Sequence, residues 1–309
     1  MRQSLIAARI GAVWHLLAAA RPVFLTGGVA VYTLGVVVAW HETGNTNPGL
    51  LVAGLAVVLL VQLMTDLLNE YWDQEGDVLV TRRTFFSGGS GALQSGALRP
   101  ATVYRAATAC GLAGLLLTLA LGLRGNLSAV SASVVALAVC GGMFYSQPPA
   151  RLVARGLGEI TVAVVVCFLA PALGYSLQTG GLSMLLVATG LPAMMIVFSM
   201  LLAIELPDYA ADVATGKRNL VVRLGPRRAA RLYAVCVVAC YVACVAGLRL
   251  GVPAPVALLP LLTAPFAVVE IRLVREAGGA DLSRAPLMTF LGSALFAAVC
   301  LLQIAGYVL

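Results

Sequence analysis

The stretch LLVAGLAVVLLVQLMTDLLNEYWDQEGD, residues 50–77, joins a long apolar run to a cluster of acids. Its first part, 50–68, is mostly aliphatic and is about as long as the roughly 20 residues that an α-helix needs to cross a bilayer. The last nine residues, NEYWDQEGD, hold four carboxylates: Glu70, Asp73, Glu75 and Asp77. The pattern predicts a transmembrane helix that ends in a dense acidic cluster. Because charge is costly near a bilayer, such a cluster indicates a functional site.

The whole chain has the composition of a membrane protein. Of its 309 residues, 61% are hydrophobic and only 11% are charged, and the mean hydropathy is +0.96, far from the values of soluble domains. Backbone groups in hydrocarbon must be hydrogen-bonded within their own segment, and the apolar runs are too long for barrel strands, so the spans are predicted to be α-helices. We expect an all-α, polytopic fold with about nine spans, at 22–40, 49–70, 103–123, 127–145, 157–177, 182–204, 229–248, 253–271 and 287–307.

The basic residues predict the orientation of these spans. Of the 20 lysine and arginine residues, all but Arg124 and Arg249 fall in the N-terminal segment or in loops after even-numbered spans. By the positive-inside rule, the N-terminus is cytoplasmic and the C-terminus is outside, in the plasma (inner) membrane. The net charge of +7 then follows from topology and gives no reason to expect a nucleic-acid partner. Residues 1–20 are predicted to form an interfacial amphipathic helix on the lipid bilayer, because Arg9 interrupts their apolar stretch.

Eight of the 13 acidic residues occur where two of the predicted spans reach the cytoplasm. Two groups have a helical spacing of three or four residues, which places each group on one helix face: Asn69, Asp73 and Asp77, and Glu205, Asp208 and Asp212. Neighbouring carboxylates repel one another, and a hard divalent cation relieves that repulsion. The two stripes of oxygen ligands therefore favour Mg²⁺, which often shares its coordination with substrate phosphates.

The two acidic stripes occupy matching places in the chain. Each follows the second span of a group of four, so we predict two four-helix pseudo-repeats plus a ninth span. This arrangement brings both stripes to one central cavity that faces the cytoplasm, where Mg²⁺ ions clamp a diphosphate from both sides. Two other interpretations remain open. The acids could pair with neighbouring arginines at the interface, or they could serve ion translocation, which expects carboxylates near mid-span, whereas only Asp66 lies a turn deeper than the others.

The motifs are similar to those of a known family. NEYWDQEGD (69–77) resembles the first aspartate-rich motif, N-x-x-x-D-x-x-x-D, of the UbiA superfamily of intramembrane prenyltransferases, and ELPDYAADVATGKRNLVVRLG (205–225) resembles the second, D-x-x-x-D with a trailing G-K and L-G. Three further segments are similar to the branch that prenylates 1,4-dihydroxy-2-naphthoate in menaquinone synthesis: GGSGALQSGALRP (88–100), YSQPPARLVARGLGE (145–159) and LGYSLQTG (173–180). The likeness covers nearly the whole chain, so residues 1–309 are expected to form one domain.

The resemblance implies an enzyme that transfers an isoprenyl group from a prenyl diphosphate to an aromatic acceptor such as 1,4-dihydroxy-2-naphthoate, with Mg²⁺ as cofactor and an allylic cation as intermediate. Carried over by position, it assigns Mg²⁺ binding to one set of residues, of which the aspartates are also the catalytic residues: Asn69, Asp73, Asp77, Asp208 and Asp212. In place of the Asn and Arg that are common in the naphthoate branch, this chain has Glu205 and Pro207. Glu205 is expected either to ligate Mg²⁺ or to bind a cationic or hydroxyl group of a different acceptor.

The same resemblance assigns substrate-binding residues. Lys217, in the matching G-K, and Arg151 are expected to contact the diphosphate, with Arg155 as the alternative to Arg151, while Tyr145 is expected to face the reaction centre. Arg82 lies between the first motif and the glycine-rich loop and could close on the diphosphate. Interfacial anchoring remains an alternative for Lys217, Tyr145 and Arg82. For the function as a whole, the alternatives are another acceptor, cyclisation of the prenyl cation, or a transporter or assembly protein without catalysis.

Overall fold

The computed structural model describes residues 14–81 and 83–309, and all regular secondary structure in this part of the chain is helical. Within it, nine segments are long and apolar enough to cross a membrane, which confirms the predicted all-α, polytopic class: Pro22–Thr43, Pro48–Trp72, Pro100–Leu123, Ala129–Ser146, Gly158–Thr179, Met184–Glu205, Pro226–Leu250, Ala254–Gly278 and Ala285–Val308. The chain is an integral membrane protein. Most of the helix predicted over residues 1–20 lies outside the described residues; residues 14–19 are helical, and Ala19 and Ala20 are buried.

Local signals determine where the long helices begin. Proline, with its fixed φ and missing N–H, suits a first helical turn, and it opens four of them: α2 (Pro22–Thr43), α3 (Pro48–Trp72), α5 (Pro100–Leu123) and α12 (Pro226–Gly247). Asn47 also caps α3, since its side-chain oxygen accepts hydrogen bonds from the N–H groups of Gly49 and Leu50 at 2.9 and 3.2 Å. Serine caps two more helices: α6 (Ala129–Ser146) and α9 (Met184–Glu205). The last span is α15 (Ala285–Val308).

Two spans differ from the continuous helices expected at 157–177 and 253–271. The fifth is divided into α7 (Gly158–Val164), the π-helical η2 (Val165–Leu169) and α8 (Ala170–Thr179). The eighth is divided into α13 (Ala254–Leu258), the 3₁₀ segment η4 (Leu259–Thr263) and α14 (Ala264–Gly278). Proline explains both interruptions, because Pro171, Pro260 and Pro265 lack the N–H that the α-helical pattern requires.

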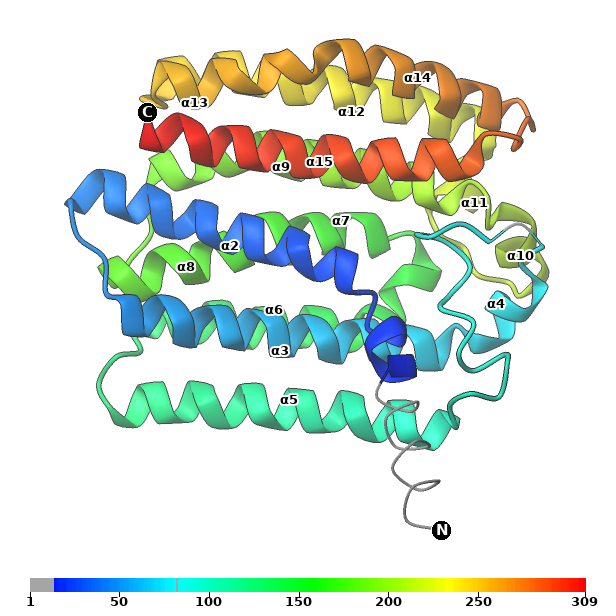
Figure 1. Ribbon diagram of the computed structural model, residues 1–309, viewed down its shortest axis with the longest axis horizontal. Helices are drawn as coiled ribbons and strands as arrows, with labels where there is room; N and C mark the ends of the chain where they lie inside the picture. Colours follow the sequence, from blue (N-terminus) through cyan, green and yellow to red (C-terminus); the bar gives the residue numbers. More distant parts are fainter. Residues whose placement is uncertain (1–13, 82) are drawn as a thin grey trace.

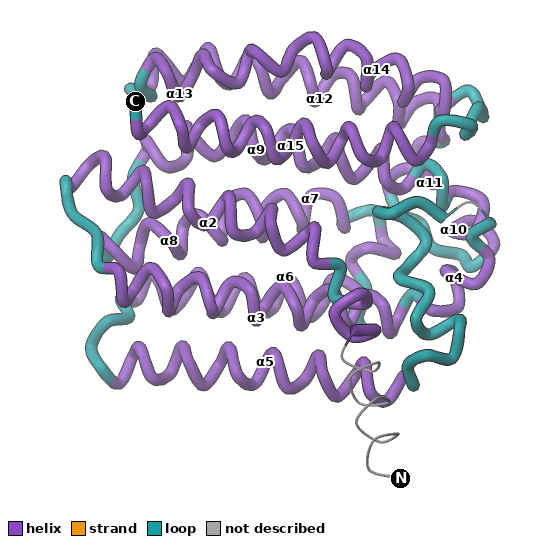
Figure 2. Tube along the Cα trace, viewed as in Figure 1, coloured by secondary structure: helices purple, strands orange, loops and turns teal. Residues whose placement is uncertain are grey.

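The spans lie side by side, with α5 at one edge of the bundle and α12, α13 and α14 at the other (Figure 1). The most extensive helix contacts are α3 with α5 and α9 with α12, so the second and third spans of each half pack together. The short helices α4 (Gln74–Leu79), α10 (Tyr209–Ala214) and α11 (Leu220–Leu224) all lie at one end of the bundle, opposite the C-terminus. The long loop between α4 and α5 runs beside α10 and α11 at that end (Figure 2).

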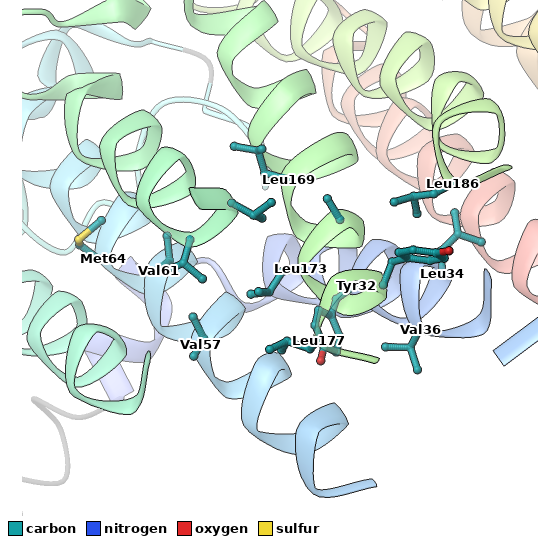
Figure 3. Packing of buried hydrophobic residues seen from close by; sticks show 14 of the residues in the cluster. Tyr32, Leu34, Val36, Val57, Val61, Met64, Leu169, Leu173, Leu177 and Leu186 are labelled. Atoms are coloured by element: carbon teal, nitrogen blue, oxygen red, sulfur yellow. The ribbon is translucent and has the colours of Figure 1, made fainter. Parts of the chain in front are cut away.

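Glycine allows helices from the two halves to approach closely. A Cβ built on Gly35 of α2 would lie 1.9 Å from the carbonyl oxygen of Pro171 in α8, and one on Gly174 would lie 2.5 Å from that of Tyr32. Close packing of small residues is a main source of helix association in membranes, where the hydrophobic effect between helices is absent. Tyr32 belongs to a buried apolar cluster that α2, α3 and α8 share (Figure 3). These contacts fix the first half of the chain against the second.

Candidate active site

Each aspartate motif spans a break between a long helix and a short one. Asp73 lies between α3 and α4, and Asp77 lies within α4. Asp208 lies in the same way between α9 and α10, and Asp212 lies within α10. The N–H of Asp77 donates to the carbonyl of Asp73 at 3.0 Å, and the N–H of Asp212 donates to that of Asp208 at 2.9 Å. One helical turn separates the carboxylates of each motif, so the two share a face.

Both motifs open into one cavity of about 320 Å³, which is lined mainly by α2, α3, α6, α7, η2, α8 and α9, with α4, α10 and α15 also contributing. Every predicted site residue in the described part of the chain lines this cavity: Asn69, Asp73, Asp77, Tyr145, Arg151, Glu205, Asp208, Asp212 and Lys217. Arg82 lies outside the described residues. Side chains from the two halves of the chain therefore meet around one space.

Lys217 connects the two motifs. Its Nζ donates a hydrogen bond to Oδ2 of Asp73 at 2.8 Å and lies 3.6 Å from Oδ1 of Asp212. Burial disfavours the ammonium charge, but these two carboxylates outweigh that effect and raise the pKa of Lys217 well above its usual value. Asn219 fixes Asp212 as well, because its Nδ2 donates to Oδ2 of that residue at 2.7 Å. A stably charged lysine thus stands between carboxylates of opposite halves.

Three other carboxylates of the site each have one oxygen without a partner. Oδ2 of Asp77, Oδ1 of Asp208 and Oε2 of Glu205 are buried without a hydrogen-bond partner. Desolvation by burial raises the pKa of Asp77 to about 7 and that of Asp208 to about 6, and it also raises the pKa of Asp212. A nearby cation stabilises a buried, unpaired carboxylate. The donor set, made of oxygen atoms, suits a hard divalent ion such as Mg²⁺.

The carboxylates do not form a closed metal cage by themselves. Among residues 14–81 and 83–309, no three His, Cys, Asp or Glu side chains are grouped so that they could hold a metal ion. Mg²⁺ commonly takes only one or two carboxylates and completes its coordination with water and substrate phosphates. Carboxylates on opposite walls of a cavity fit that shared mode of binding.

The glycine-rich loop 87–91 contacts both motifs. The N–H of Gly88 donates to Oδ2 of Asp208 at 3.1 Å. Gly89 has a φ of +70° and lies so close to the first motif that a Cβ there would be 2.1 Å from Oδ2 of Asp77. Both the left-handed backbone and the close approach require glycine at this position. The loop is thus a fixed part of the cavity wall and joins α4 to the start of α10.

Residues 29–293 match the model of the UbiA prenyltransferase family. The chain belongs to this family. It is therefore a membrane-embedded transferase, and its motifs 69–77 and 205–225 occupy the cavity of a UbiA fold. No curated protein matches the chain in sequence.

Solved structures of UbiA proteins share the fold over almost the whole length of the chain. A UbiA homologue from Archaeoglobus fulgidus bound to DMAPP and Mg²⁺ is 17% identical, with 92% of this chain and 98% of that chain covered and a TM-score of 0.64. The same homologue bound to GPP and Mg²⁺ is also 17% identical, with 94% and 99% covered and a TM-score of 0.61. A structure of digeranylgeranylglyceryl phosphate synthase is 13% identical, with 95% and 99% covered and a TM-score of 0.59.

Arg21 lines the UbiA-type cavity and was not predicted as a site residue. It lies just before α2, with Nη2 3.6 Å from Oε2 of Glu70, and it also interacts electrostatically with Asp77 and Asp208. In the analysis of the sequence, Arg21 was used only as one of the basic residues that predict the orientation of the spans. The signal that points to it is its place at the N-terminal end of the first predicted span, on the side of the membrane where both acidic stripes are expected.

Two buried polar residues that were not predicted as site residues hold the site in place, and sequence reasoning missed both roles. Glu70 is fully buried and does not line the cavity, and it accepts a hydrogen bond from the N–H of Ser90 at 3.0 Å, which anchors the glycine-rich loop. Asn219 caps α11 through the N–H of Val222 at 2.9 Å while it holds Asp212. Asn219 falls within the segment that resembles the second motif, but spacing alone does not distinguish it from its neighbours.

The structure distinguishes the two candidate arginines after the fourth span. Arg151 lines the cavity, and its Nε is buried without a hydrogen-bond partner. Arg155 is exposed and donates from Nη2 to the carbonyl of Pro149 at 2.7 Å. Of the two, only Arg151 is positioned to meet a ligand in the cavity.

The deeper part of the cavity is apolar. Val61 of α3, Leu169 of η2 and Leu173 of α8 line it (Figure 3). These residues lie within membrane-spanning segments, whereas the paired aspartates lie at the helix ends. The cavity therefore has a charged head region and a mostly apolar interior, which suits a molecule with a charged group at one end and a hydrocarbon tail.

Proposed function

We propose that this UbiA-family protein transfers an isoprenyl group from a prenyl diphosphate to an aromatic acceptor, and that residues 1–309 act as one catalytic domain. The observation that carries the proposal is the convergence of both aspartate motifs and Lys217 on a single cavity. Family membership supports the reaction class. The related structures bound to DMAPP or GPP with Mg²⁺ support the donor and the cofactor.

The head region would bind the donor diphosphate. Residues of both motifs would hold Mg²⁺ together with the donor: Asn69, Asp73, Asp77, Glu205, Asp208 and Asp212. Bound Mg²⁺ supplies positive charge where negative charge grows as the carbon–oxygen bond of the donor breaks. Lys217 and Arg151 would contribute fixed positive charge at the same place, and Tyr145 would face the reacting carbon. In a site with little water, such preorganised charges stabilise a departing diphosphate strongly.

The apolar interior would bind the isoprenoid tail and protect the allylic cation. Val61, Leu169 and Leu173 present hydrocarbon to the tail, so burial of the tail contributes to donor affinity. Exclusion of water prevents hydrolysis of the cation. An electron-rich aromatic ring would then form the new carbon–carbon bond to the allylic cation and lose its ring proton to the released diphosphate.

For the acceptor we propose a hydroxylated aromatic acid of the 1,4-dihydroxy-2-naphthoate type, which the three similar segments 88–100, 145–159 and 173–180 support. Glu205 supports a second candidate, since its buried and unpaired Oε2 could bind a hydroxyl group of a different acceptor. We also propose that the cavity opens to the cytoplasm from the plasma (inner) membrane. The distribution of basic residues supports this orientation.

The decisive experiment measures diphosphate release by purified protein with geranylgeranyl diphosphate, Mg²⁺ and a panel of hydroxylated aromatic acids. We expect release and a prenylated product with the wild type. Asp73→Ala and Asp208→Ala should each reduce the rate by about 100-fold or more, since each removes an electrostatic element of the transition state. Glu276→Ala is the matched control. Glu276 is an exposed carboxylate near the C-terminal end of α14, and it does not line the cavity. Absence of turnover with every acceptor and chain length would refute the function.

A further inference from the structure

The polar lining of the cavity continues below the first motif. On α3 and α4, five polar residues that line the cavity recur at intervals of three or four: Gln62, Asp66, Asn69, Asp73 and Asp77. This spacing places them along one face. Asp66 and Gln62 do not belong to the motif and lie one and two turns deeper in the membrane-spanning helix.

The stripe residues on either side of Asp66 are Asn69 and Gln62, and each forms a hydrogen bond to another helix. Ser146 of α6 donates a hydrogen bond to Oδ1 of Asn69 at 2.8 Å. Gln62 donates from Nε2 to the carbonyl of Phe24 at 2.8 Å, and it packs against Gly28 so closely that a Cβ there would lie 2.1 Å from Oε1. These two side chains hold helices together.

Asp66 has no such contact. Its Oδ2 is buried and has no hydrogen-bond partner, although the side chain lines the cavity. A buried carboxylate oxygen without a partner costs free energy that a structural role would not explain. Arg21, which also lines the cavity, interacts electrostatically with Asp66, but its ion pair is with Glu70. Within a span, an acidic residue that has an unpartnered oxygen and also lines a cavity indicates a binding function.

Asp66 also lies where a reaction partner must be. Its neighbours along α3 on the cavity wall are Asn69 on the head side and the uncharged Thr65, Gln62 and Val61 on the deep side, so Asp66 is the deepest charged residue that α3 contributes to the lining. A donor with its diphosphate among the motifs and its tail along Val61 has its reacting carbon at this depth. The ring that attacks this carbon has to lie there too.

We propose that Asp66 binds the acceptor by accepting a hydrogen bond from a hydroxyl group on its aromatic ring. This inference rests on the proposed prenyl transfer and assigns the acceptor a required ring hydroxyl. A hydrogen bond to a carboxylate orients the ring and increases its electron density at the same time, which favours attack on a carbocation. Asp66 is then an acceptor-binding residue and is not a ligand of the metal.

The test compares acceptor kinetics in the full-length protein with geranylgeranyl diphosphate, Mg²⁺ and 1,4-dihydroxy-2-naphthoate as the first of a panel of hydroxylated aromatic acids. Asp66→Ala should raise the acceptor KM about ten- to a hundredfold, which is the usual effect of losing a hydrogen bond to a charged group. Asp66→Asn keeps an acceptor oxygen and should show an intermediate KM. The donor KM and the Mg²⁺ concentration for half-maximal rate should stay at wild-type values.

Glu270→Gln is the matched control. Glu270 is a fully buried carboxylate in a span and, like Asp66, has unpartnered oxygen, but it lies on α14 and does not line the cavity. Its variant should keep the wild-type acceptor KM. A second readout uses 2-naphthoate, which lacks ring hydroxyls, as a competitive inhibitor. The wild type should bind it more weakly than the dihydroxy compound, and Asp66→Ala should bind the two about equally.

The outcomes separate the two proposals. If the wild type transfers the prenyl group and Asp66→Ala has an unchanged acceptor KM, the assignment of Asp66 is wrong and the prenyl transfer stands. If Asp66→Ala changes the Mg²⁺ requirement in place of the acceptor KM, Asp66 is a metal ligand and the assignment is also wrong. If the wild type transfers to none of the hydroxylated acids, the proposed function fails, and the inference fails with it.

Discussion

Replacement of Lys217 by methionine should destabilise the protein in the absence of Mg²⁺ and make its stability depend more strongly on the metal. The Lys217 and Asp73 side chains are only 19% and 12% exposed, and their charged atoms are 2.8 Å apart. At an effective dielectric constant of about 20, two unit charges at this distance attract by about 6 kcal/mol before the cost of desolvation. Without Lys217, Asp73 and Asp212 face each other with no cation between them.

Removing one partner of a buried ion pair typically costs about 3–5 kcal/mol. A loss of about 3 kcal/mol corresponds to a fall in Tm of roughly 6–12 °C for a chain somewhat smaller than this one. Mg²⁺ should restore more of the Tm in Lys217→Met than it adds to the wild type, because lysine no longer competes for the two carboxylates. The kcat/KM for the donor should still fall about ten- to a hundredfold, from the loss of a charge-assisted hydrogen bond to the diphosphate.

The assay is thermal unfolding in detergent at several Mg²⁺ concentrations, followed by donor kinetics under the same conditions. Lys217→Arg is the control, since it keeps the positive charge and should remain within a few degrees of the wild type without metal. Equal stabilisation of the wild type and Lys217→Met by Mg²⁺ would show that the lysine and the metal do not compete for these carboxylates. An unchanged Tm without metal would show that the pair contributes nothing to folding.

Three further results are expected. Gly89→Ala should reduce diphosphate release about tenfold or more, because a Cβ there meets Asp77. The control is Gly96→Ala, which has a similar φ of +72° but open space around it and should keep the wild-type rate. Equal rates for the two variants would show that the contact with Asp77 does not matter for activity. Arg151→Ala should raise the donor KM about tenfold, and Arg155→Ala should leave it near the wild-type value; the reverse pattern would transfer the role to Arg155. A chelator of divalent cations should abolish diphosphate release and excess Mg²⁺ should restore it, so activity that persists in the chelator would contradict the proposed cofactor.

The spans could be predicted from the sequence because length and hydropathy alone decide whether a helix crosses a membrane. The sequence also predicted the meeting of Asp73 and Asp208 at one cavity, since matching positions in two pseudo-repeats leave few other arrangements. The division of the fifth span into α7, η2 and α8 was not predicted. Its cause, Pro171, is visible in the sequence, but a proline in a span can kink the helix or leave it nearly straight, depending on the neighbouring helices.

Within the site, sequence reasoning found the residues that repeat on a helix face and missed those that act through the tertiary structure. Arg21 is distant in the sequence from every carboxylate it faces. The hydrogen bond from Gly88 to Asp208 joins residues 120 positions apart, which no local pattern encodes. The direct pairing of Lys217 with Asp73 is of the same kind. The family resemblance named Lys217, but only the packing of α4 against α10 shows what it contacts.

The dense acidic cluster at the end of α3 is explained by a division of tasks among its carboxylates. Asp73 and Asp77 line the cavity, while Glu70 is fully buried on another face and anchors the glycine-rich loop through Ser90. The other half of the chain has a counterpart: buried Glu159 of α7 accepts a hydrogen bond from the N–H of Leu220 at 2.6 Å.

Each of these glutamates ties a loop at the motif end of the molecule to the helical bundle. Glu70 holds the loop that contacts Asp77 and Asp208, and Glu159 holds the segment that carries Lys217 and Asn219. If the proposed prenyl transfer holds, loops anchored in this way lose little conformational entropy when a diphosphate enters. Glu70 and Glu159 would then support donor affinity without touching the donor, and such anchoring explains carboxylates that do not line the cavity.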